Sequence, residues 1–121
     1  MIRSEANMRL YFLGKGGSEG GGCPSLYYTD RDTYVVQGWQ TGTPETIEIP
    51  QRLLGFLQQE TYIGAAMTDT GRGTFALSGV PVTDTDALAQ MNIYPNETAV
   101  EVPKLERTFY GNAASAGRVL Q

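Results

Sequence analysis

The chain has 121 residues, which is the size of one domain. Nine lysine and arginine residues against 13 aspartate and glutamate residues give a net charge of -4, which argues against a surface that binds nucleic acid directly. There is no histidine and only one cysteine, so an intramolecular disulfide and a Cys/His metal cluster are both excluded. The apolar runs are much shorter than the roughly 20 residues that span a bilayer, and we expect no secretory signal. We therefore predict a cytoplasmic protein with no membrane contact.

The N-terminal third predicts a strand, a loop and a hairpin. Leu10 to Leu13 form an apolar run that is typical of a short strand. The segment from Gly14 to Gly22 holds six glycines in nine positions, which favours a loop over any regular element. Two β-rich runs follow, Leu26 to Thr29 and Thr33 to Trp39, and the Asp30-Arg31-Asp32 cluster between them predicts an antiparallel hairpin.

A third strand and a helix are expected next. Polar and apolar residues alternate around Ile47 and Ile49, so these two side chains share one buried face. Pro50 leads into a segment with leucines at helical spacing, and we predict a short helix from about Gln51 to Glu60. Gly55 weakens this helix by roughly 1 kcal/mol relative to alanine, so packing must hold it.

The second half of the chain repeats the plan of the first. At a constant offset, the aligned positions are Thr29, Arg31, Thr33, Tyr34 and Gly38 with Thr70, Arg72, Thr74, Phe75 and Gly79. Ile47-Glu48-Ile49-Pro50 aligns with Val100-Glu101-Val102-Pro103 at an offset larger by 12. The insertion, Thr83 to Tyr94, predicts a short helix that Asp84 caps. We interpret the pattern as an internal duplication, the alternative being two similar hairpins.

We therefore predict an α+β fold of small antiparallel β-hairpin and sheet units with short helices, built as two ββ-β-α-like repeats in one domain. Residues 1–9 are expected to form a flexible N-terminal extension. The first repeat spans 10–60 with the glycine loop at 14–22, and the second spans 61–109 with the inserted helix at 83–94. Residues 110–121 have the composition of a flexible C-terminal tail.

The sequence offers no convincing catalytic, cofactor or metal site. The glycine loop lacks the phosphate-binding motifs, and a strand rather than a helix is expected after it. Cys23 has no histidine in the chain to activate it and is best interpreted as a small buried side chain. The paired carboxylates lie where turns and helix caps use them, at Asp30 and Asp32 and at Asp84 and Asp86. We expect no enzyme activity, no cofactor and no metal.

The Thr33 to Trp39 strand carries apolar side chains on both faces. Tyr34 and Val36 lie on one face, and Val35 and Trp39 lie on the other. One face enters the core, and either the second repeat or another chain must cover the other. Tyr27 and Tyr28 extend this argument, because tyrosine is favoured at protein interfaces.

Parts of the first half resemble a known family. These are the Gly20-Gly21-Gly22-Cys23 turn, the hairpin strand at Tyr34 to Val36, the strand at Ile47 to Ile49, and Leu53 with Phe56-Leu57. In order and spacing they resemble the BldB-like small acidic proteins of actinomycetes. The resemblance implies a regulatory protein, without catalytic residues, that binds a helix-turn-helix DNA-binding protein of the Xre class encoded beside it.

The sequence therefore predicts a non-enzymatic interaction protein, and the resemblance implies that it binds and modulates a helix-turn-helix transcriptional regulator. The partner-binding residues we expect are Tyr28, Asp30, Trp39, Glu45 and Glu48, the acidic ones steering the complex and the aromatic ones making the buried contact. One alternative is a self-assembling homodimeric module. A less favoured alternative is a small-ligand or nucleotide-binding domain that uses the glycine loop.

Overall fold

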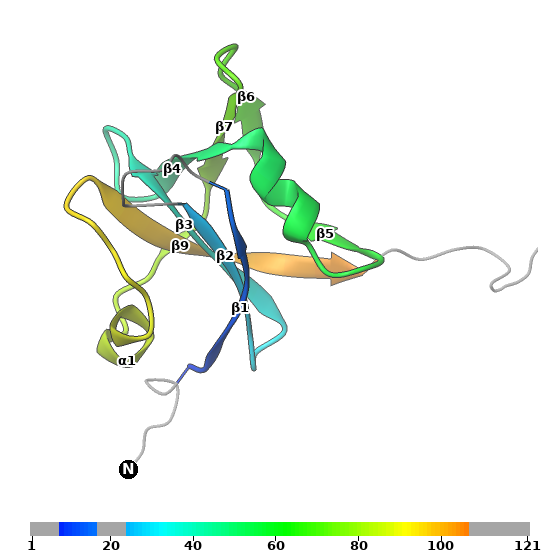
Figure 1. The fold of residues 1–121 in the computed structure, drawn as a ribbon, viewed down its shortest axis with the longest axis vertical. Coiled ribbons are helices and arrows are strands. Elements are labelled where there is room, and N and C mark those ends of the chain that lie inside the picture. Colours follow the sequence, from blue (N-terminus) through cyan, green and yellow to red (C-terminus); the bar gives the residue numbers. More distant parts are fainter. Residues whose placement is uncertain (1–7, 17–23, 107–121) are drawn as a thin grey trace, which may run out of the picture.

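The computed structural model describes residues 8–16 and 24–106 (Figure 1). Most of the glycine loop, Cys23, the first seven residues and the predicted C-terminal tail lie outside the described residues. We predicted a flexible extension over residues 1–9, but its last two residues, Met8 and Arg9, are described by the structure. Met8 is only 3% exposed. The Arg9 carbonyl accepts a hydrogen bond from the Asp30 amide, and the Arg9 amide donates to the Asp30 carboxylate. Met8 and Arg9 are therefore part of the folded body.

Strands dominate the described part of the chain. In order, the elements are β1 (Leu10–Lys15), β2 (Ser25–Thr29), β3 (Thr33–Gln40), β4 (Thr46–Pro50), the 3-10 helix η2 (Gln51–Phe56), β5 (Thr61–Ile63), β6 (Met67–Asp69), β7 (Thr74–Ser78), β8 (Val80–Pro81), α1 (Thr85–Ala89) and β9 (Glu97–Glu106). The predicted antiparallel hairpins are confirmed, since every pairing between these strands is antiparallel. The two helices are short, so the fold is mainly β and not α+β as the sequence suggested.

Both predicted helices are shorter than expected. The segment expected to be helical to Glu60 forms η2, which stops at Phe56 because Leu57 adopts an extended ψ of 147°. Gly55 weakens regular α-helix here, and Leu53 anchors the tighter turn by complete burial. The inserted helix is confirmed as α1, and the Asp84 carboxylate accepts a hydrogen bond from the Asp86 amide as predicted for its N-cap. Neither helix, within the ranges described, is long and apolar enough to cross a membrane.

β3 is the centre of the sheet. It pairs with β2 along one edge and, further along the same strand, with β4, while β9 runs beside it in Figure 1 and pairs with it from Thr33 to Trp39. The order β1-β2-β3-β4-β7-β6 places β1 and β6 at the two ends of this path. β9 extends beyond β3 and also pairs with β5 and β8.

Two hydrophobic cores lie on opposite faces of β3. The larger one contains Tyr34, Val36, Ile47 and Ile49, together with Leu53 from η2. The smaller one is formed by Met8, Leu10, Tyr27, Val35, Ala87, Met91 and Ala99. Residues of α1 and the segment after it therefore cover the second face of β3, so this chain itself buries Val35. Tyr27 also belongs to this core, which corrects our expectation that it lies at an interface.

The two hairpins pair with their third strands in the same register. The matching pairs are Tyr34–Val102 and Val36–Val100 between β3 and β9, and Phe75–Ile49 and Leu77–Ile47 between β7 and β4. β3 thus pairs with a third strand from the second half, and β7 pairs with a third strand from the first. Neither half contains its own complete sheet.

The two hairpin turns also share a set of polar contacts. The members are Thr29, Arg31, Thr33 and Glu101 around one turn, and Thr70, Arg72, Thr74 and Glu48 around the other. In each set the two threonine hydroxyl oxygens are 2.6 Å apart, and the second threonine donates to the glutamate. The arginine pairs with the same glutamate, at 3.7 Å in the first set and 2.8 Å in the second. These contacts tie each turn to the neighbouring strand.

Candidate protein-interaction surface

The structure divides the five predicted partner-binding residues between two places. Tyr28 lies on β2 opposite Tyr34, and Asp30 follows in the turn, so both are near the start of β3. Trp39 is at the other end of β3, where it lies opposite Glu48 of β4. Glu45 is exposed just before β4. The five residues therefore do not form one contact surface.

Glu48 is already engaged within the chain. Its Oε2 accepts hydrogen bonds from the Thr74 hydroxyl and from Arg72, the latter at 2.8 Å. The Thr74 hydrogen bond, helped by Arg72, holds the pKa of this carboxyl below its ordinary value of 4.5. The geometry thus gives Glu48 a structural role, which weakens our expectation that it steers a partner.

Trp39 is half-buried and lies between two glutamates, Glu48 on β4 and Glu97 on β9. Glu97, in register with Trp39, is 3% exposed. The Glu97 Oε1 accepts hydrogen bonds from the Gln37 side chain at 2.8 Å and from the Tyr94 amide at 3.2 Å. Its Oε2 has no hydrogen-bond partner among the described residues. Burial, with the nearby Glu97 charge, raises the pKa of Tyr27. Glu97 and Gln37 are buried, so this polar network lies inside the fold.

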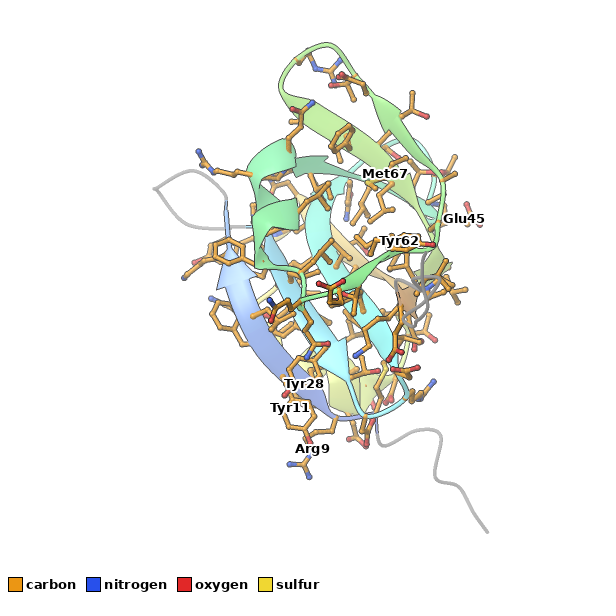
Figure 2. The ribbon with its side chains drawn as sticks, turned by 90° about the vertical axis from the view of Figure 1, so that its right-hand side faces the viewer. Arg9, Tyr11, Tyr28, Glu45, Tyr62 and Met67 are labelled. Atoms are coloured by element: carbon orange, nitrogen blue, oxygen red, sulfur yellow. The ribbon has the colours of Figure 1, made fainter. Side chains whose placement is uncertain are left out.

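Of the five predicted residues, Tyr28 is the one that contacts an exposed aromatic side chain. Its ring stacks on Tyr11 of β1 with the centroids 4.8 Å apart, and the two lie side by side in Figure 2. The Lys104 Nζ lies 5.5 Å from the centroid of the Tyr28 ring and 5.6 Å from that of Tyr34. The half-buried Tyr28 ring is therefore fixed between a cation and Tyr11, and Tyr11 presents its ring to solvent.

Three large aromatic side chains, two on β1 and one on the neighbouring η2, are substantially exposed. Tyr11 is 42% exposed, Phe12 is 58% exposed, and Phe56 of η2 is 40% exposed. The Phe56 ring lies directly on Gly14, where an added Cβ would come within 2.3 Å of the ring. Because β1 ends the strand order and pairs only with β2, no strand in the part of the chain that the structure describes covers its outer edge. We call Tyr11, Phe12 and Phe56, with the open side of β1, the aromatic edge.

Our sequence reasoning assigned β1 as a strand but missed the aromatic edge. The signal was present in Leu10 to Leu13, where four successive apolar residues put large side chains on both faces of one strand. The following glycine-rich segment also separates this strand from the rest of the sheet in sequence. A strand of this kind at the end of a sheet leaves part of its apolar surface in solvent.

The described residues hold no group of three or more histidine, cysteine, aspartate or glutamate side chains placed to bind a metal. Comparisons of the chain with protein-family models, with curated proteins and with solved structures found no match. The aromatic edge is therefore assigned on its geometry alone.

Proposed function

We propose that this chain is a non-enzymatic interaction protein that binds a protein partner through the aromatic edge. The observation that carries the proposal is the exposure of Tyr11, Phe12 and Phe56 around one open strand. Tyr11 and Phe12 are consecutive on β1, so their exposed side chains flank the open edge from both faces of the sheet. Exposed large aromatic side chains beside such an edge mark association sites. Open strand edges are also ready places for another chain to join a sheet.

The partner we propose is a helix-turn-helix transcriptional regulator, with modulation of that regulator as the biological role. This choice rests on the resemblance of the first half to the BldB-like proteins. The net charge of -4 supports it, because an acidic protein is matched to a basic DNA-binding partner. Asp30 and Glu45 are exposed, although the Asp30 Oδ1 also accepts a hydrogen bond from the Arg9 amide, whereas Glu48 is held by Arg72.

We propose further that the two halves are copies of one unit. The shared register and the paired turn contacts support this, as do the equivalent positions of Gly38 and Gly79, which both approach a neighbouring backbone closely. The insertion that forms α1 explains the main difference between the copies. In one copy, Ala87 of α1 packs in the same core cluster as Val35 and Ala99. In the other copy, which has no such helix, the equivalent positions are Ala76 and Thr46, and both are half-buried.

The proposed function is tested by titrating the purified chain with a helix-turn-helix protein of the Xre class from the same organism, the partner that the resemblance implies. We expect Phe12→Ala to weaken binding by about tenfold or more, as truncation of an anchoring aromatic residue does. The matched control is Val80→Ala, because Val80 is 66% exposed but lies on β8, which pairs with β9 and not with β1. Equal affinities for the two variants would refute the assignment to the aromatic edge. Light scattering of the chain alone tests the alternative, since a stable homodimer that Phe12→Ala dissociates would favour self-assembly.

A further inference from the structure

The backbone of β1 directs alternate groups away from the sheet. The Arg9 carbonyl accepts a hydrogen bond from the Asp30 amide, so the backbone groups of Arg9 face the β2 side. Because these groups alternate along an antiparallel strand, those of Leu10 and Phe12 face outward. A bulge between Phe12 and Gly14 then interrupts the strand. The outward edge is therefore short and centred on Leu10 and Phe12.

Gln90 occupies the first part of this edge in the manner of a neighbouring strand. Its side-chain amide donates to the Met8 carbonyl at 2.8 Å and accepts from the Leu10 amide at 2.9 Å. A strand paired with β1 would make the same two hydrogen bonds with its backbone. Beyond Gln90, the backbone N–H and C=O of Phe12 face the outer side of β1, where no described strand pairs with it. A strand added on this side would therefore pair with Phe12.

The charges around this edge define the chemistry of the occupant. In a chain of net charge -4, residues 8–16 and 51–57 carry Arg9, Lys15 and Arg52 and no carboxylate. Asp30 and Asp86 lie near Arg9, so the positive charge is concentrated towards Lys15. Arg52 is held at the same end, where its Nε donates to the Gly16 carbonyl at 2.9 Å. Pro24, opposite Gly16, has no N–H to offer that carbonyl.

We infer that the aromatic edge binds an extended acidic segment of the partner protein by strand addition to β1 at Phe12, with a carboxylate of that segment near Lys15. This inference rests on the proposed function, since it names how the partner is held. Backbone hydrogen bonds supply affinity in this mode of binding, and side chains beside the strand supply specificity. A second copy of this chain is a poorer occupant, because pairing β1 with β1 brings like charges together without a carboxylate in either strand.

The test uses two synthetic peptides that alternate valine with charged residues, one acidic and one basic, and follows the amide chemical shifts of the chain. We expect the acidic peptide to shift the amides of Leu10, Phe12 and Lys15, and the basic peptide to leave them unchanged. Phe12→Pro removes the outward N–H, and proline is tolerated where an edge N–H faces solvent. Phe12→Ala removes only the side chain. Strand addition predicts that Phe12→Pro binds the acidic peptide about fivefold more weakly than Phe12→Ala, the effect of one backbone hydrogen bond.

A second variant keeps the test decisive if Phe12→Pro does not fold. Lys15 is exposed, so Lys15→Glu leaves the core intact and is expected to lose binding of the acidic peptide.

Equal binding of both peptides, or no shift in β1, would overturn the inference. Shifts that depend only on protein concentration would assign the edge to a second copy and overturn it too. If the regulator binds Phe12→Pro as tightly as Phe12→Ala, strand addition fails and the proposed function stands. If the acidic peptide binds but the regulator does not, the proposed partner fails and strand addition stands.

Discussion

Gly38 gives the sharpest test of how closely β3 and β4 pack. A Cβ placed on Gly38 would lie 2.7 Å from the Glu48 carbonyl oxygen and 2.8 Å from the Ile49 Cγ2. The first contact is with backbone, which cannot turn aside as a flexible side chain does. Gly38→Ala therefore forces the two strands apart at the edge of the larger core.

The expected loss follows from two opposing effects. Overpacking of this kind destabilises a fold by roughly 1–3 kcal/mol. Replacing glycine by alanine also restricts the unfolded chain, which returns about 0.5 kcal/mol. We expect Gly38→Ala to lower the free energy of unfolding by about 1.5 kcal/mol, which for a chain of this size lowers the Tm by about 6 °C. Gly79→Ala should behave alike, because its Cβ would lie 2.8 Å from the Glu101 carbonyl oxygen.

The assay is urea unfolding followed by far-UV circular dichroism, with Gly55→Ala as the matched control. Gly55 has no heavy atom within 4 Å of an added Cβ, so this substitution should raise stability by about 0.5 kcal/mol. If Gly38→Ala is as stable as wild type while Gly55→Ala behaves as expected, the close approach of β3 to β4 is not what requires glycine there.

Three further predictions follow from individual contacts. The Thr74 hydrogen bond lowers the pKa of Glu48, so its carboxylate stabilises the fold above pH 4.5 and this contribution is lost as the pH falls through the lowered value. The stability advantage of wild type over Glu48→Gln should therefore be full at neutral pH and vanish in acid, and an advantage that persists in acid would contradict this. Tyr34→Phe should lower the free energy of unfolding by about 1–2 kcal/mol, because the buried hydroxyl accepts from the Gln58 amide at 2.8 Å; an unchanged urea midpoint would count against it. Glu97→Ala should cost about 1–3 kcal/mol in urea unfolding, and Glu97→Gln less, since glutamine keeps the acceptor and removes a buried charge; equal losses would show that the acceptor is unimportant.

Local pattern was enough to predict most of the strands. The alternation at Ile47 and Ile49 predicted a buried face, and both side chains are completely buried in β4. Asp84 predicted the start of α1 because capping depends on neighbours in sequence. The helix expected to reach Glu60 was wrong in extent because tertiary packing of Leu53, rather than helix propensity, decides that segment.

The interaction surface was harder to predict because it depends on which strand ends the sheet. Trp39 and Tyr28 drew attention as aromatic residues, yet both are half-buried by neighbours that are distant in sequence. The neighbour of Tyr28 is Lys104, and no local pattern connects the two. Phe12 is the most exposed aromatic residue described, and a short run of apolar residues cannot show on its own whether a second strand covers it.

The exchange of third strands between the halves has a consequence for synthesis of the chain. β3 needs β9, which is made last among the described elements, so the first hairpin leaves the ribosome long before its main neighbour does. Until then Tyr34, Val36 and the other apolar residues of β3 have no complete core to enter. Sheets built from such distant pairings fold slowly, and until folding is complete they expose apolar surface that is prone to aggregate. The nascent chain is therefore expected to depend on a chaperone more than its small size suggests, and to gain its native sheet in one late cooperative step.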